Sequence, residues 1–214
     1  MPELPQILVD SIVFILPLWV ANAAPTLLGG GPPIDGGRLW RDGRRILGDG
    51  KTIRGFWMGV LSGTLTGGLV AILVPIFEGV LLQGSTVDTT TFLRLYYLDL
   101  WPTSSLYQVL GALQIEDLLS DPLLFGLMAS FIMSFGGLAG DIIGSFIKRR
   151  SGIERGHTFI FLDQLGFLLM GTIFVYPLIP VPIEWFLVLV PITFITHIAA
   201  NLFGYFTGIQ DAPL

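Results

Sequence analysis

Two aspartates lie inside strongly apolar stretches of this sequence, on either side of a basic segment. Between Asp141 and Asp163 stand four cations, namely Lys148, Arg149, Arg150 and Arg155. On a helix, Asp141, Ser145 and Lys148 share one face, because they are spaced four and then three residues apart. Carboxylates are ligands for divalent metal ions, and cations bind phosphates. The pattern therefore predicts a site that holds a metal ion beside a phosphorylated substrate.

The same residues also allow a purely structural interpretation. A carboxylate that is buried unpaired in a membrane costs several kcal/mol, so an intramembrane aspartate is either functional or paired. Asp141 and Asp163 could form buried salt bridges with Lys148 and Arg155. The basic residues alone would then serve to orient the chain in the membrane.

Other polar groups gather toward the same ends of the apolar stretches. Asn22 ends the first stretch in ANAAP, and the loop from 25 to 54 is rich in glycine and in cations. Its many backbone N–H groups suit a phosphate cradle, although a flexible loop has the same composition. His197 and Asn201 stand one helical turn apart near the end of the last stretch, where they could bind substrate or hydrogen-bond between helices.

The elements that must position these residues are membrane spans. Hydrophobic residues make up 52% of the 214 residues and charged residues only 13%, which excludes an ordinary soluble domain. Five apolar runs are long enough to cross a bilayer, which takes about 20 helical residues. They cover roughly 5 to 24, 55 to 83, 121 to 147, 158 to 180 and 183 to 208. We expect an all-α, polytopic membrane protein, built as one five-helix domain over 1–214.

The distribution of charge predicts the orientation. Ten of the eleven basic residues lie in the first loop or between 148 and 155. With five spans, these two loops and the C-terminus share one face, which the positive-inside rule makes cytoplasmic. The N-terminus then lies outside, and because the chain opens without a basic segment, the first span should be retained. The outer segment from 84 to 120 should carry a short interfacial helix around its aromatic residues.

Small residues recur at fourfold spacing on two of the expected helices. They form two rows, Gly59, Gly63 and Gly67 in the second span and Gly136, Gly140 and Gly144 in the third. Rows of this kind let helix backbones approach closely. We expect them to pack the helices and so to hold the charged residues in fixed positions. The long second and third spans should also tilt or project beyond the hydrocarbon.

Several motifs closely resemble those of a known family. They are DIIGSFIKRRSGIERG followed by LDQ, together with NAAP, IDGG and GDGKTIRG, and they extend over nearly the whole chain. The chain resembles the archaeal CDP-archaeol synthases, which are membrane CTP transferases related to bacterial and eukaryotic phosphatidate cytidylyltransferases. The signature positions of that superfamily are occupied here by Ser145, Lys148, Arg149, Gly156, His157 and Asp163. The continuation RSGIERGHT departs from the bacterial pattern and favours the archaeal ether-lipid branch.

The resemblance implies a reaction and a set of site residues. The phosphate of 2,3-di-O-geranylgeranylglyceryl phosphate, an unsaturated archaetidic acid, would attack the α-phosphorus of CTP, giving CDP-archaeol and pyrophosphate. Such a transfer needs mainly positioning and neutralisation of charge. Asp141 and Asp163 would ligate Mg²⁺, with Lys148 as a third catalytic residue. The expected substrate-binding residues are Asn22, Lys51, Thr52, Arg54, Ser145, Arg149, Arg155, His197 and Asn201.

Two other classes of function remain open on the sequence. Apolar spans with buried charges could form a carrier for an ion or a small solute, but a carrier places its polar groups near the bilayer midplane. Here Asp141, Asp163, Asn22 and Asn201 all cluster toward one face, which favours an enzyme working at the membrane surface. A scaffold whose basic loops bind anionic lipids would leave the aspartates unexplained. No nucleic-acid partner is expected, and with no cysteine the chain has no thiolate metal site.

Overall fold

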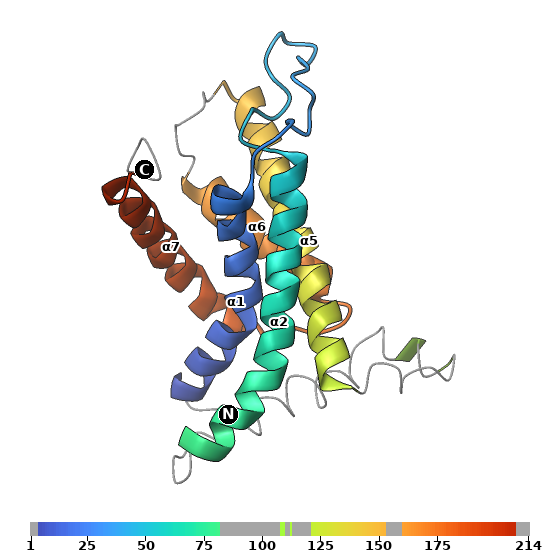
Figure 1. The fold of residues 1–214 in the computed structure, drawn as a ribbon, viewed down its shortest axis with the longest axis vertical. Helices are drawn as coiled ribbons and strands as arrows, with labels where there is room; N and C mark the ends of the chain where they lie inside the picture. The colour runs from blue at the N-terminus through green and yellow to red at the C-terminus, as the bar shows by residue number, and fades with distance from the viewer. Residues whose placement is uncertain (1–3, 82–107, 110–111, 113–120, 153–159, 209–214) are drawn as a thin grey trace.

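The computed structural model describes residues 4–81, 108, 109, 112, 121–152 and 160–208 (Figure 1). Its named elements are five helices, one at each predicted apolar run: α1 (Leu4–Leu28), α2 (Ile53–Leu81), α5 (Pro122–Arg150), α6 (Ile160–Val175) and α7 (Ile183–Phe206). The all-helical fold class is therefore confirmed. The interfacial helix expected around 92–101 lies outside the described residues.

Four of these helices are long and apolar enough to cross a membrane. The candidate spans are Ile7–Leu28, Ile53–Val74, Pro122–Arg150 and Ile183–Phe206. The two longest helices, α2 and α5, have 29 residues each, as the length of their apolar runs predicted. Their ends therefore have the length to extend past the hydrocarbon, which a helix of about 20 residues already crosses.

The fourth span is shorter than predicted. The apolar run covers 158 to 180, whereas α6 has only 16 residues and is about 24 Å long. The helix ends at Val175 because Pro177 lacks an N–H group and disfavours the helical conformation of Tyr176 before it. The chain then turns, and Leu178 and Ile179 are buried. The apolar residues that continued the run in the sequence therefore pack in the core instead of extending the helix.

Helix α5 lies in contact with α1, α2 and α6, and glycines bring these helices close. Between α2 and α5, a Cβ atom added at Gly67 would lie 1.7 Å from Oγ of Ser130. Between α5 and α6, a Cβ atom added at Gly140 would lie 2.6 Å from the carbonyl oxygen of Gly166. Any larger side chain would push the helices apart, so the packing role predicted for the glycine rows is confirmed at Gly67 and Gly140.

Helix α7 packs mainly on α1. The indole Nε1 of Trp19 donates a hydrogen bond of 3.2 Å to Oγ1 of Thr193, which joins the two helices inside the bundle. The opposite side of α7 is open, and Phe203 is 67% exposed. This face is apolar, as a surface in contact with lipid requires.

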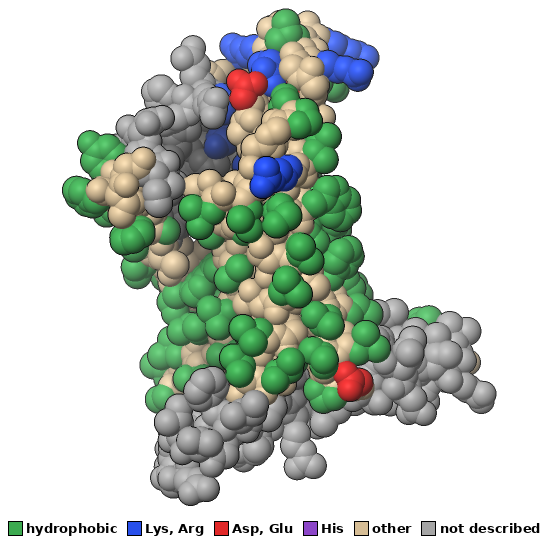
Figure 2. Space-filling view, viewed as in Figure 1, with side chains coloured by type: hydrophobic (Ala, Val, Ile, Leu, Met, Phe, Trp, Pro, Cys, Tyr) green, Lys and Arg blue, Asp and Glu red, His purple; other side chains and the backbone are tan. Residues whose placement is uncertain are grey.

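Charged and apolar side chains occupy different parts of the surface. Figure 2 shows apolar side chains over the middle of the bundle and basic side chains toward one end. That end carries the loop between α1 and α2 and the C-terminal end of α5 (Figure 1). The described parts of the two basic segments, which the sequence predicted to share a face, are therefore adjacent.

Candidate active site

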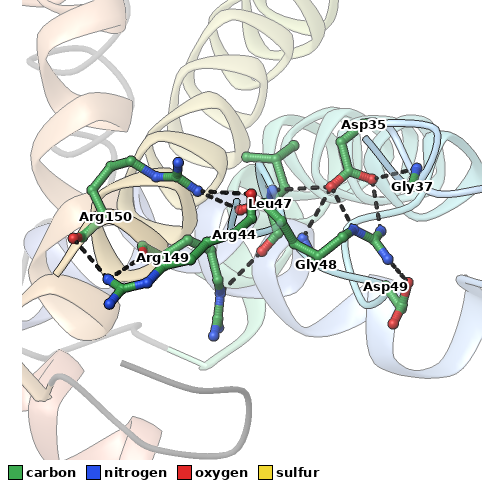
Figure 3. Close-up of polar contacts among 9 residues, drawn as sticks. Asp35, Gly37, Arg44, Leu47, Gly48, Asp49, Arg149 and Arg150 are labelled. Atoms are coloured by element: carbon green, nitrogen blue, oxygen red, sulfur yellow. Dashed lines mark hydrogen bonds and ion pairs between the residues drawn. The ribbon is translucent and has the colours of Figure 1, made fainter. Parts of the chain in front are cut away.

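The loop between α1 and α2 is folded around the carboxylate of Asp35. Its oxygens accept hydrogen bonds from the backbone N–H groups of Gly37 at 3.0 Å, Leu47 at 3.0 Å and Gly48 at 3.4 Å (Figure 3). The guanidinium of Arg45 adds charged hydrogen bonds through Nε at 3.3 Å and Nη2 at 2.8 Å. Gly48 has a φ of +125°, a backbone conformation that residues other than glycine rarely adopt. The loop is thus folded around a fully buried carboxylate that belongs to the loop itself.

The surroundings of Asp35 fix its charge. Burial by itself raises the pKa of this carboxyl, but the hydrogen bonds from Arg45, Leu47, Gly37 and Gly48 together outweigh burial and hold the pKa well below its usual value. Asp35 is therefore an anion at neutral pH. Three amides of the loop that the sequence offered to a substrate phosphate bind this carboxylate instead.

Three arginines, which we call the loop clamp, fasten this loop to the end of α5: Arg44, Arg149 and Arg150. Nη1 of Arg150 pairs with Oδ1 of Asp42 at 2.6 Å. Nη1 of Arg44 donates to the carbonyl oxygens of Arg149 at 3.4 Å and Arg150 at 3.3 Å. Nε of Arg149 donates to the carbonyl oxygen of Leu47 at 3.2 Å. The clamp joins the first loop to α5 at the end where the basic residues gather (Figure 3).

Aromatic contacts strengthen the clamp. The rings of Trp40, from the loop, and Phe146, from α5, meet edge to face with centroids 5.3 Å apart. The guanidinium carbon of Arg150 lies 5.2 Å from the centroid of Phe146 and 5.9 Å from that of Trp40. Both distances are within the range of a cation–π interaction, so charge and packing act on the same arginine.

A small, partly open pocket lies beside this loop, between α1, α2 and α5. Its lining residues are Pro25, Ile34, Gly50, Lys51, Thr52, Gly55, Phe56, Leu138, Asp141 and Ile142. Inside it, the ammonium of Lys51 forms an ion pair with the carboxylate of Asp141, and the two side chains are 29% and 26% exposed. A residue predicted to bind substrate and a residue predicted to bind metal therefore meet in one pocket.

Backbone contacts fix Lys51 and Thr52 at this place. The N–H of Ile34 donates to the carbonyl oxygen of Lys51 at 2.8 Å, which pairs the two ends of the loop. Oγ1 of Thr52 accepts a hydrogen bond of 3.0 Å from the N–H of Gly55, so Thr52 caps the first turn of α2. The start of α2 therefore sets where the side chain of Lys51 leaves the chain.

The other described site candidates lie around the pocket. Asn22 is on α1, one turn before Pro25, which lines the pocket. Ser145 is buried on α5, one turn beyond Asp141. Arg54 is exposed on the first turn of α2 and does not line the pocket. Lys148 and Arg149 occupy the last turn of α5.

Asp163 lies on α6 near the level of Asp141. Gly166, three residues further along α6, packs against Gly140, the residue before Asp141. This contact between backbones brings the two positions to neighbouring levels of α5 and α6. The side chains of Asp163, His197 and Asn201, and the whole of Arg155, Gly156 and His157, lie outside the described residues. A second carboxylate ligand at Asp163 therefore stays a prediction.

The carboxylate in the pocket fits a metal ion that is held jointly by the protein and by substrate phosphates. In the part of the chain that the structure describes, no group of three His, Cys, Asp or Glu side chains surrounds a common point. Mg²⁺ needs no such cage, because it is commonly held by one or two carboxylates together with substrate phosphates and water. Asp141 offers a carboxylate of this kind at the pocket.

Three contributors to the site were not singled out from the sequence: Asp35, Asp42 and Phe56. The two aspartates did carry a signal, because Asp35 and Asp42 each precede a glycine in a loop. That pair is typical of turns in which the carboxylate binds backbone two residues on. Phe56 had no such signal, since it stands among many apolar residues of the second span.

Comparison with known proteins defines the class. A solved structure described as an intramembrane enzyme for archaeal membrane lipids biosynthesis has a TM-score of 0.62 to this chain at 30% sequence identity, covering 91% of this chain and 94% of that one. Apolar spans around a charged pocket, in a fold shared with such a protein, make this chain a multi-pass intramembrane enzyme. A carrier and a membrane scaffold, the two alternatives left open by the sequence, receive no support from this comparison.

Sequence relatives narrow the class to one family. A CarS-like family model, CDP-archaeol synthase, matches residues 4–100 and 103–214. The CDP-archaeol synthase of Thermococcus gammatolerans is 40% identical over 203 residues, covering 95% of this chain and 94% of the relative. Those of Pyrococcus horikoshii and Methanococcus aeolicus are 38% and 36% identical, each covering 96% of both chains. The chain belongs to the CDP-archaeol synthase family, as its motifs indicated.

Proposed function

We propose that this chain is a Mg²⁺-dependent cytidylyltransferase that transfers CMP from CTP to an unsaturated archaetidic acid, giving CDP-archaeol and pyrophosphate. Family membership supports the reaction. The observation that supports the place of the reaction is the ion pair of Lys51 and Asp141 in the pocket. The same pocket is lined by Phe56 and Leu138, so a nucleotide phosphate and the apolar part of a lipid both find matching side chains there.

Lys51 and Asp141 exchange partners when substrate binds. The ammonium of Lys51 turns from the carboxylate to a phosphate oxygen of CTP, where a charge-assisted hydrogen bond contributes roughly 1.5 to 3 kcal/mol. Asp141, and with it Asp163, then provides oxygen ligands for the metal. When bound, Mg²⁺ neutralises phosphate charge and favours attack at the α-phosphorus. The two side chains thus neutralise each other before substrate binds. With substrate bound, Lys51 contacts a phosphate and Asp141 contacts the metal.

Cations at the end of α5 complete the site. We assign Lys148 and Arg149 to the triphosphate, because they lie on the last turn of α5, where it meets the loop. Asn22, Thr52, Arg54, Ser145, Arg155, His197 and Asn201 remain assigned to substrate binding. A phosphate monoester is already an anion at neutral pH, so the lipid needs no general base before its oxygen attacks and pyrophosphate leaves.

The pocket is placed on the cytoplasmic side in this proposal. Basic residues mark the cytoplasmic ends of spans, and the loop and the end of α5 that carry them flank the pocket. The lipid then stays in the membrane while its phosphate meets CTP at the surface. The C-terminus lies on the same side and the N-terminus outside.

One assay tests this proposal. The purified protein, in lipid nanodiscs with radiolabelled CTP, Mg²⁺ and the ether-lipid phosphate, should form labelled CDP-lipid and release an equal amount of pyrophosphate. Omitting the lipid or chelating the metal should abolish both products, and Asp141→Asn should lower both together. If the protein binds CTP and the lipid but forms neither product under any of these conditions, the assignment is wrong.

A further inference from the structure

An aromatic cluster covers one side of the bundle next to the pocket. We call it the aromatic wall, and its members are Phe56 and Trp57 of α2, Phe131 and Phe135 of α5, and Phe174 of α6. Phe135 is its centre: its ring centroid lies 5.4 Å from that of Phe56, 6.4 Å from that of Trp57 and 6.3 Å from those of Phe131 and Phe174. The wall therefore bridges three helices with one continuous set of ring contacts.

The aromatic wall belongs to the surface of the bundle. Trp57 is 53% exposed, Phe131 43% and Phe174 37%. The buried core is built elsewhere, from residues such as Phe14, Leu18 and Leu168. Large rings that contact each other and remain partly exposed can still contact an apolar molecule from the membrane side.

The aromatic wall is continuous with the candidate active site. Phe56 lines the pocket and also contacts Phe135. On α5, Phe131, Phe135, Leu138 and Ile142 are spaced four, three and four residues apart, so they share one face of the helix. Leu138 and Ile142 line the pocket. An apolar molecule lying along this face would run from the pocket into the membrane.

The length of this path suits a lipid chain. Asp141 is ten residues beyond Phe131, which corresponds to about 15 Å along the helix. That distance covers about half of a bilayer core some 30 Å thick. A lipid whose phosphate reaches Asp141 and Lys51 would therefore lay its chain over Phe135 and Phe131 within its own leaflet.

We propose that the aromatic wall binds an isoprenoid chain of the lipid substrate and so selects for long prenyl chains. This inference rests on the proposed cytidylyltransferase function, because it assigns the polar end of the same molecule to the pocket. The repeated double bonds and methyl branches of a prenyl chain present flat, polarisable surfaces that pack against aromatic faces. Phe135, which contacts the other four rings, is the residue on which binding of the chain most depends.

Kinetics with two lipid phosphates test the assignment. Phe135→Ala should raise the KM for the geranylgeranyl substrate roughly tenfold, the effect expected from losing one aromatic contact. The KM for CTP should stay unchanged, and so should turnover of a short-chain analogue that does not reach Phe135. The control is Phe203→Ala, which removes an exposed phenylalanine ring from α7, away from the aromatic wall, and should leave all these values unchanged.

The outcomes separate the two proposals. If the unsubstituted protein makes no CDP-lipid, the cytidylyltransferase function fails. If it is active but Phe135→Ala behaves like Phe203→Ala with both lipids, the aromatic wall is not a chain-binding site and the function stands. A KM increase that is equal for long and short lipids also contradicts the inference, because a chain contact cannot act on a substrate that does not reach it.

Photocrosslinking of the unsubstituted protein tests whether the lipid chain lies on the aromatic wall, even if Phe135→Ala fails to fold. A lipid phosphate with a diazirine midway along its chain should label peptides that contain Phe131 and Phe135, and unlabelled substrate should compete. Bulk membrane lipid would instead label α7 around Phe203 to the same extent and would not be displaced. Equal, uncompeted labelling of both regions would overturn the inference.

Discussion

The ammonium of Lys51 and the carboxylate of Asp141 form an ion pair that joins the first loop to α5 across 90 positions of the sequence. Because both side chains are partly exposed in the pocket, the pair contributes only about 0 to 1 kcal/mol to stability. A charge-assisted hydrogen bond to a phosphate contributes roughly 1.5 to 3 kcal/mol. In the proposed function, a substrate phosphate therefore displaces Asp141 from Lys51, and the predictions below test whether the pair is a functional contact or a structural one.

Replacing Asp141 by Asn tests the metal-binding assignment. The amide keeps the size of the side chain but removes its negative charge, so metal-dependent turnover should fall by about two orders of magnitude or more. The melting temperature without ligand should change little, since the lost pair is partly exposed. The rise in melting temperature on adding CTP with Mg²⁺ should shrink, because ligand stabilisation follows affinity. Asp163→Asn should behave in the same way.

Near-normal turnover and an unchanged Mg²⁺ dependence in both Asn variants would contradict the two-aspartate site. In that case the aspartates would be structural partners of cations, the alternative that the sequence left open. Lost expression or a lowered melting temperature, with normal activity per folded molecule, would point the same way.

Replacing Lys51 by Met tests the phosphate-binding half of the exchange. The methionine keeps the apolar stem but loses the ammonium, so the KM for CTP should rise roughly tenfold or more, as expected when a charged hydrogen bond is lost. Lys51→Arg keeps the charge and should retain part of the affinity. Arg41→Ala removes an exposed cation from the same loop and serves as the control. An equal effect of Lys51→Met and Arg41→Ala would mean that only the general positive field matters.

Asp35 is predicted to hold the loop in shape. Asp35→Asn weakens several charged hydrogen bonds at once, each worth roughly 1.5 to 3 kcal/mol, so trypsin should cut the loop at Arg38 and Arg41 much faster. Asp49→Asn is a matched control, because Asp49 also pairs with Arg45 but its side chain is 63% exposed. It should leave the rate of cleavage nearly unchanged. If trypsin cut the loop of both variants at the same rate, Asp35 would not be the residue that holds the loop in shape.

The lowered pKa of Asp35 also predicts a dependence on pH. A carboxyl whose pKa is lower in the folded protein stabilises it at every pH above the ordinary value of about 3.9. The contribution is lost as the pH falls below that value toward the lowered pKa. Hydrogen exchange of the loop peptide 33–52, corrected for intrinsic rates, should therefore stay slow from neutral pH down to about 4 and accelerate below it. In Asp35→Asn this acid transition should disappear.

The helices could be predicted from the sequence, but the length of α6 and the ion-pair partner of Asp141 could not. Uninterrupted apolar residues located all five helices, whereas the end of α6 depends on Pro177 and on the burial of Leu178. Spacing on one helix made Lys148 the nearest cation for Asp141. The partner found in the structure is Lys51, because the folded loop brings it there. The turn at Asp35 had a local signal, but the contacts of Asp35 with Arg45, Leu47 and Gly48, which shape the loop, depend on tertiary structure.

Single cysteines test the orientation without interference, since the chain has no cysteine of its own. Cysteine at Arg41 and at Ser151, both exposed in the structure, should be protected from a membrane-impermeant reagent in intact cells and react after lysis. Cysteine at Asp88, in the segment predicted to lie outside, should react in intact cells. The reverse pattern would place the pocket on the outer face, where CTP is absent, and would contradict the proposed reaction.

The loop clamp should affect catalysis through the position of Lys51. Arg150→Gln removes the ion pair with Asp42 and the contact with Phe146, so the loop should separate from α5 more often. The KM for CTP should then rise while the KM for the lipid phosphate stays the same, because the lipid chain lies against α2 and α5 below the loop in our proposal. Arg150→Lys keeps the charge but loses the forked geometry and should restore part of the affinity for CTP. If Arg150→Gln instead raised both KM values equally, or lowered the melting temperature of the bundle with unchanged kinetics, the clamp would serve the fold as a whole and not the placement of Lys51.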